Sequence, residues 1–119
     1  MGTIVQDLKA SADRATRAGI ERRRIVVDPG IGFGKRGDQN YEILAELDRM
    51  NSLEFPILVG TSRKSFLGNK LSDEQRLMAT ASTITAAILR GAHIVRVHDV
   101  RQMAEVARVA DALLKVGEL

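Results

Sequence analysis

Short apolar segments that alternate with helical patterns constrain this sequence more than any other feature. Each segment is rich in β-branched residues, ends in glycine or polar residues, and reads as a buried strand. A helical pattern follows each one, at the roughly 30-residue spacing of strand–helix–strand units. This alternation predicts an α/β fold in which parallel strands, joined by right-handed crossovers, are covered by helices. The predicted strands are Arg24–Asp28, Pro56–Gly60 and His93–Val97.

Apolar periodicity and capping residues define four helices. Ser72 with Gln75 forms a capping-box pattern, Thr3 with Gln6 resembles another, and Gly91 offers a helix stop. The order is therefore one helix followed by three strand–helix units. The helices are expected over Thr3–Ala18, Asn40–Met50, Ser72–Arg90 and Asp99–Val116, with Asn40 and Asp99 as caps and with Met103, Val106, Ala107, Ala110 and Leu114 on the apolar face of the last.

The predicted elements do not make a complete barrel or a comfortable open sheet. Three parallel strands leave two sheet edges that need cover, and the first helix has no strand before it. A chain of 119 residues allows one domain at most. We therefore expect residues 1–119 to form one partial domain, taken from a longer strand–helix repeat.

Composition excludes several classes of protein. The chain has no Cys, which removes disulfide scaffolds, Cys-ligated metals and thiol nucleophiles and suits a reducing compartment. No apolar run approaches the roughly 20 residues of a membrane helix, and the first residues lack a signal-peptide layout. We expect a soluble cytoplasmic protein with no membrane partner.

The positive charge of the chain favours small anions over a polynucleotide. The net charge is +3, and the one basic cluster is Arg22–Arg24. Aromatic residues make up only 3% of the chain, whereas single-stranded nucleic acids are bound on platforms of several aromatic side chains. A basic nucleic-acid-binding module therefore stays an alternative, and a site for a small anionic ligand is preferred.

Polar side chains follow each predicted strand at its carboxyl end. Asp28 follows the first strand, Ser62–Lys64 follow the second, and Arg96, His98 and Asp99 lie in and after the third. Ligands bind at this edge in parallel α/β folds, both in barrels and in open sheets. We therefore expect Asp28, Lys64, Arg96 and His98 to face one shared concavity.

The segment Asp28–Lys35 is the first of three motifs. A glycine-rich turn leaving a strand is the simpler interpretation of its Asp-Pro-Gly start. Its alternating glycines would also let the backbone approach a flat ligand, Asp28 offers two acceptor oxygens, and Phe33 offers an aromatic wall. The glycine spacing does not match a dinucleotide-binding fingerprint.

The other two motifs carry positive charge. In Gly60–Ser65 the glycine that a phosphate loop needs before its lysine is replaced by Arg63, so the segment predicts instead a helix start suited to a carboxylate or phosphate. In the third strand Arg96 and His98 lie on one face, an arrangement that favours a bound anion. His93, at the strand's other end, is assigned no chemistry.

At these three motifs the chain closely resembles the carboxyl-terminal part of the dihydropteroate synthases, in the pterin-binding enzyme group. The resemblance rests on Asp28–Lys35, Gly60–Gly68 and Gly91–Val100 and covers nearly the whole chain. It implies the last three strand–helix units, plus one preceding helix, of a (β/α)8 barrel. It also implies folate biosynthesis, in which 6-hydroxymethyl-7,8-dihydropterin diphosphate and 4-aminobenzoate give 7,8-dihydropteroate and diphosphate.

The resemblance implies a role for each candidate residue. Catalysis would fall to Lys64, Arg96 and His98, and sulfonamides would compete with the aminobenzoate. Mg²⁺ is expected for the full enzyme, with its protein ligand absent from this chain, and a homo-oligomer is expected through the last helices. By carry-over, Asp28, Lys64 and Arg96 bind the pterin, Phe33, Ser62 and Lys64 bind the aminobenzoate, and Arg96 and His98 bind the diphosphate.

One alternative within the same group is a pterin-dependent methyltransferase. The pairing of Ser62–Lys64 with Arg96–His98 argues against it. Nothing in the sequence matches the first half of the synthase family, and a small ligand needs most of its surface enclosed to bind tightly. We therefore expect the isolated chain to be inactive.

Overall fold

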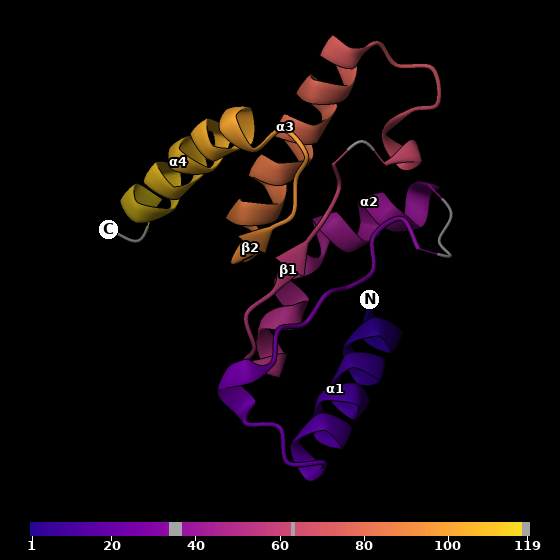
Figure 1. The fold of residues 1–119 in the computed structure, drawn as a ribbon, viewed down its shortest axis with the longest axis vertical. Helices are drawn as coiled ribbons and strands as arrows, with labels where there is room; N and C mark the ends of the chain where they lie inside the picture. Colours follow the sequence, from indigo (N-terminus) through magenta and orange to yellow (C-terminus); the bar gives the residue numbers. More distant parts are fainter. Residues whose placement is uncertain (34–36, 63, 118–119) are drawn as a thin grey trace.

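The computed structural model describes residues 1–33, 37–62 and 64–117, which form an α/β arrangement with parallel strands (Figure 1). The two longest helices, α3 and α4, lie together toward one end of the molecule, and α1 lies toward the other. As predicted, one helix is followed by three units, each made of an extended segment and a helix. The elements are α1 Gly2–Arg17, a 3₁₀ helix Arg22–Arg24, α2 Gly37–Ala45, a 3₁₀ helix Leu47–Leu53, β1 Leu58–Val59, a 3₁₀ helix Ser65–Leu67, α3 Asp73–Leu89, β2 Ile94–Val95 and α4 Val100–Gly117.

The sheet is parallel, as predicted, but its strands are shorter than the apolar segments suggest. Strand β1 pairs with β2 in the register Leu58↔Ile94 and Val59↔Val95. The predicted first strand is reduced to an isolated parallel bridge between Val27 and Ile57. Its first residue, Arg24, belongs to a 3₁₀ helix instead. The three segments lie side by side in chain order, with their carboxyl ends at one edge.

The first two helices differ from the predictions at their amino ends. Helix α1 begins at Gly2 after Met1, with no side-chain capping bond, so the predicted Thr3–Gln6 capping box is wrong. Asn40 lies inside α2 and does not cap it, because its side chain is buried and accepts a hydrogen bond from the Gly32 backbone N–H. The predicted helix over residues 40–50 is divided into α2 and the 3₁₀ helix that follows it.

Helices α3 and α4 match the predictions closely. The Ser72 hydroxyl accepts from the Gln75 N–H while the Gln75 side chain accepts from the Ser72 N–H, so the predicted capping box is present. The chain leaves α3 through Gly91 at φ +108°, a conformation that glycine adopts without strain. The predicted apolar face of α4 packs against α3 in one cluster, with Met103 and Ala110 fully buried.

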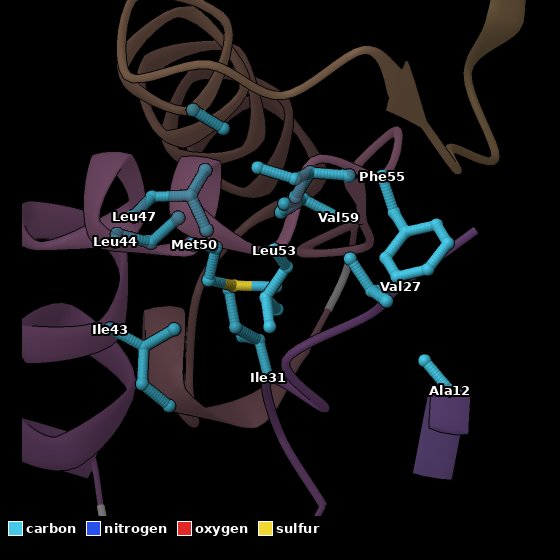
Figure 2. Packing of buried hydrophobic residues seen from close by; sticks show 12 residues of the cluster. Ala12, Val27, Ile31, Ile43, Leu44, Leu47, Met50, Leu53, Phe55 and Val59 are labelled. Atoms are coloured by element: carbon cyan, nitrogen blue, oxygen red, sulfur yellow. The ribbon is translucent and has the colours of Figure 1, made fainter. Parts of the chain in front are cut away.

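A second, larger apolar cluster joins the sheet to the first half of the chain (Figure 2). It brings β1 and Val27 against α2 and the 3₁₀ helix Leu47–Leu53, and α1 contributes Ala12. Leu47, Met50 and Ile57 are completely buried in it. The cluster joins the sheet to the helices of the first half of the chain. In the described ranges, no helix combines the length and the apolar character that crossing a membrane requires.

Candidate functional site at the carboxyl ends of the strands

A pocket of about 250 Å³ lies where β1 and β2 end. The strand register brings the residues after Val59 beside those after Val95, although they are 36 positions apart in the sequence. Three of the pocket's side chains are basic, and one is a buried serine. The lining residues are Gly60, Ser62, Lys64, Arg96, Val97 and His98.

Arg96 reaches the pocket across Gly60. The backbone N–H of Arg96 donates to the carbonyl of Val59, which places the arginine directly beside that glycine. A Cβ at position 60 would lie 3.3 Å from Nε of Arg96, so a larger residue there would push the guanidinium aside. The absence of a side chain at Gly60 therefore decides where this positive charge lies.

Lys64 connects the pocket to the loop that contains the first motif. Its Nζ donates to the carbonyl oxygen of Ile31 at 2.5 Å and lies 4.7 Å from the centre of the Phe33 ring. Gly32 has φ +85°, and a Cβ there would lie 2.7 Å from Cδ of Lys64. Since Asn40 holds Gly32 in place, this loop, the lysine and α2 form one connected unit.

Ser62 and His98 contact each other twice. The Ser62 hydroxyl accepts a hydrogen bond from the His98 backbone N–H at 3.1 Å, and the same oxygen lies 2.9 Å from Nδ1 of the ring. Ser62 is only 5% exposed, whereas the His98 side chain is open to solvent. The loop after β1 and the loop after β2 are thus joined at the pocket itself.

A buried pair of threonines supports this corner from behind. The Thr83 hydroxyl donates to Thr61 Oγ1 at 2.8 Å, with Thr61 completely buried and Thr83 8% exposed. Thr61 directly precedes Ser62, so the bond ties the end of β1 to α3. Sequence reasoning missed both threonines, although polar residues on the buried face of a helix are a usable signal, because buried hydroxyls require partners.

The structure brings four of the predicted site residues together and leaves two beside them. Ser62, Lys64, Arg96 and His98 line one pocket, which is the shared concavity expected for three of them. Asp28 is outside the lining, and its Oδ1 accepts from the Gly30 N–H at 2.7 Å, as in the simpler turn interpretation. The ring of Phe33 is 63% exposed next to Lys64.

The second motif does not form the predicted helix start. Ser62 and Lys64 do not begin a long helix, because the segment continues only into the short 3₁₀ helix Ser65–Leu67, and α3 starts at Asp73. Arg63 lies outside the described residues, as do Gly34 and Lys35 of the first motif. The loop after β1 therefore offers side chains to a ligand without the aligned dipole of a long helix.

The surroundings of the pocket suit an anion and not a metal ion. Two of its basic side chains, Lys64 and Arg96, carry positive charge and would repel a cation. Within the described part of the chain, no group of three or more His, Cys, Asp and Glu side chains could hold a metal. Magnesium prefers carboxylate and carbonyl oxygens, so the pocket residues do not fit it.

His93 and Arg22, which lie outside the pocket, have structural partners. His93 accepts a hydrogen bond at Nδ1 from the Ile57 backbone N–H, at the opposite end of β2 from the pocket. In the Arg22–Arg24 cluster, the Arg22 guanidinium lies 4.1 Å from the centre of the Phe55 ring and donates to the Leu53 carbonyl. These contacts give His93 and Arg22 a role in the fold. They do not favour a nucleic-acid surface.

Comparison with known proteins points to the same family as the three motifs. The family model described as pterin binding enzyme matches residues 1–98. A dihydropteroate synthase of Synechocystis is 45% identical over 116 residues, which are 95% of this chain and 40% of that protein. The chain therefore spans less than half the length of this relative.

Solved structures agree with the sequence comparison. The Yersinia pestis dihydropteroate synthase in a sulfonamide drug complex has a TM-score of 0.92 at 35% identity, over 98% of this chain and 43% of that one. The Xanthomonas albilineans dihydropteroate synthase in complex with 7,8-dihydropteroate has a TM-score of 0.89 at 35% identity, over 95% of this chain and 43% of that one. Because the family model covers residues 1–98 of its 119, the chain belongs to the pterin-binding enzyme family.

Proposed function

We propose that the chain supplies the last three strand–helix units, and the helix before them, of a (β/α)8 dihydropteroate synthase. The complete enzyme would join 6-hydroxymethyl-7,8-dihydropterin diphosphate to 4-aminobenzoate in folate biosynthesis. The observation that carries this proposal is the gathering of Ser62, Lys64, Arg96 and His98 around one pocket at the carboxyl ends of the parallel strands. In barrel enzymes the active site is built at that end.

Arg96 and His98 are the proposed diphosphate ligands. In the reaction the amine nitrogen attacks the exocyclic methylene carbon, the carbon–oxygen bond to diphosphate breaks, and the amine loses a proton. Diphosphate leaves with the bonding electron pair, so negative charge grows on its bridging oxygen. A guanidinium held in place before the reaction stabilises this charge without having to reorganise. The position of Arg96 over Gly60 supports such a role.

The two organic substrates would be bound by four side chains, those of Lys64, Asp28, Phe33 and Ser62. Lys64 would donate to the pterin ring, and its closeness to Phe33 supports an aminobenzoate subsite beside it. Asp28 precedes the same loop and would accept from the amino-pyrimidinone edge of the pterin, for which its Oδ2 is the less engaged oxygen. Ser62 would contact the aminobenzoate, for which sulfonamides would compete.

The proposal extends to the metal, the assembly and the compartment of the complete enzyme. Mg²⁺ would accompany the diphosphate with a protein ligand from outside this chain, since the pocket residues do not suit it. A homo-oligomer would form through α2, α3 and α4, and the enzyme would work in the cytoplasm.

A chimaera tests the proposed function. In it this chain replaces the matching 116-residue segment of the Synechocystis enzyme. We expect the purified chimaera to form dihydropteroate, and Arg96→Ala to lower its turnover by about tenfold or more, because a hydrogen bond to a charged group contributes roughly 1.5–3 kcal/mol. Phe33→Ala should reduce turnover less, since it reshapes an exposed wall.

Arg17→Ala is the matched control, because it removes the same charge from α1, where the arginine bonds only to the Asp13 carbonyl. A folded chimaera without synthase activity, or equal turnover in Arg96→Ala and the parent, contradicts the proposal. Steep loss of mixed-DNA binding with rising salt would instead support the nucleic-acid alternative. Methyl transfer from a folate donor would support the methyltransferase alternative.

A further inference from the structure

The Ser62 hydroxyl is buried and contacts another side chain of the pocket. It is 5% exposed, and both of its contacts are to His98, which comes from the next strand. A serine hydroxyl has one proton to donate and two lone pairs that accept. The His98 backbone N–H occupies one lone pair of the Ser62 oxygen. The hydroxyl proton still requires an acceptor.

The proton has one suitable destination among the described residues. A buried hydroxyl that donates to nothing costs about 1–3 kcal/mol. Among the described residues, the ring nitrogen within hydrogen-bond distance of Ser62 Oγ is Nδ1 of His98, at 2.9 Å, and it can accept the hydroxyl proton when it carries none itself. Nδ1 is then the unprotonated nitrogen, and the proton of the neutral ring resides on Nε2.

We propose that Ser62 is a positioning residue that holds His98 in the Nε2–H tautomer, so that the ring presents a donor to an anion in the pocket. The inference rests on the proposed function for the identity of that anion, a diphosphate group. The opposite tautomer would face the anion with a lone pair of Nε2 and would weaken binding. Ser62 thereby acts on the leaving group through His98, in addition to its proposed contact with the aminobenzoate.

The composition of the chain makes the tautomer directly measurable. His93 and His98 are the only histidines, so protein labelled with nitrogen-15 histidine gives signals from two rings. Magic-angle-spinning NMR reads both tautomers whatever the size of the assembly. His93 is an internal reference, because its Nδ1 accepts from the Ile57 N–H and does not depend on Ser62.

We expect the neutral His98 ring of the parent to carry its proton on Nε2. In Ser62→Ala its two nitrogen shifts should move toward each other while those of His93 stay, and Ser62→Thr should restore them. Ser82→Ala is the matched control, because this exposed hydroxyl donates to the Met78 carbonyl within α3. A parent ring protonated on Nδ1, or His98 shifts unchanged in Ser62→Ala, overturns the proposal.

Binding of inorganic diphosphate to the Synechocystis chimaera, measured by calorimetry, separates this inference from the proposed function. Ser62→Ala should weaken binding by about threefold to tenfold, and Ser62→Thr should recover most of it. Equal affinity in Ser62→Ala and the parent overturns the positioning role. Diphosphate that fails to bind the parent chimaera contradicts the proposed function instead, since the tautomer of His98 does not depend on it.

Discussion

At the scale of single residues, two glycines determine where the pocket's positive charges lie. Gly60 leaves room for the Arg96 guanidinium, and Gly32 leaves room for the stem of Lys64. The two positions differ in one respect. Gly32 also has a positive φ of +85°, so a substitution there combines backbone strain with a steric displacement. The strain and the displacement can be measured separately.

Gly32→Ala and Gly19→Ala form a matched pair for this purpose. Both glycines have positive φ, but a Cβ at Gly19 would meet nothing within 4 Å. Each substitution should lower the free energy of unfolding by about 1–2 kcal/mol through backbone strain, since the flexible Lys64 stem can move away. In the chimaera, only Gly32→Ala should raise the KM for the pterin substrate. Equal KM values for both variants would show that Lys64 tolerates the displacement.

The sequence predicts single residues well where the signal is local. Positive φ at Gly30 and Gly32 follows from the glycine-rich turn, and the bond from the Gly30 N–H to Asp28 follows from its Asp-Pro-Gly start. The Ser62–His98 contact does not follow, because it depends on the register of two strands. A single sequence contains the alternation of each strand but not their alignment.

At the scale of elements, helix α3 holds in position the loop after β1, which lines the pocket. Its amino end is fixed by the Ser72–Gln75 capping box, and its middle is joined to the end of β1 by the Thr83–Thr61 bond. Thr83 also donates toward two carbonyls of its own helix, so its proton is shared within a buried network. The helix thus positions Ser62 through the residue immediately before it.

Thr83→Val keeps the shape of the side chain and removes its hydroxyl. We expect the free energy of unfolding to fall by about 1–3 kcal/mol, because buried Thr61 loses a hydrogen-bond partner. Thr85→Val is the control, since Thr85 bonds only to the Ala81 carbonyl of its own helix. Urea unfolding measures both variants, and an equal loss of stability in the two would rule out a special role for the link between α3 and β1.

Helices were predicted better than strands, and the reason is physical. A helix satisfies its hydrogen bonds within itself, so the periodicity and caps of α3 and α4 define it locally. A strand depends on hydrogen bonds to another segment of the chain. The apolar segment Arg24–Asp28 has one partner in this chain, at Val27, and it forms a bridge in place of a ladder. The break after Ala45 in the predicted second helix has no signal that we recognise in the sequence.

At the scale of the whole molecule, the chain exposes more surface than a compact protein of its size. Its accessible surface is 7843 Å², against about 6,300 Å² expected for a folded monomer of 13.0 kDa. Its radius of gyration is 14.9 Å, against about 13.5 Å. The excess of about 1,500 Å² is roughly twice the ~800 Å² that one partner buries in a standard protein–protein interface.

Part of the excess surface is apolar and lies in two places. Val26 and Ile94, which belong to the extended segments, are 45% and 41% exposed. Val109, Leu113 and Val116 recur at helical spacing along α4 and are also exposed. Monomers rarely leave large contiguous apolar patches in water. We therefore expect the isolated chain to associate into dimers or larger assemblies, and to form no dihydropteroate by itself.

Light scattering on the purified chain, with a synthase assay of the same sample, measures both outcomes. Leu113→Glu should reduce the mass of the assembly if the α4 face joins the copies, because the interface would then have to bury a charge. Val26→Glu should reduce the mass of the assembly if the exposed part of the sheet joins the copies. Ala104→Glu is the control on an exposed part of α4. A stable 13.0 kDa monomer that forms dihydropteroate would contradict the argument from surface area, since it would show that these patches need no partner and that the pocket is sufficient alone.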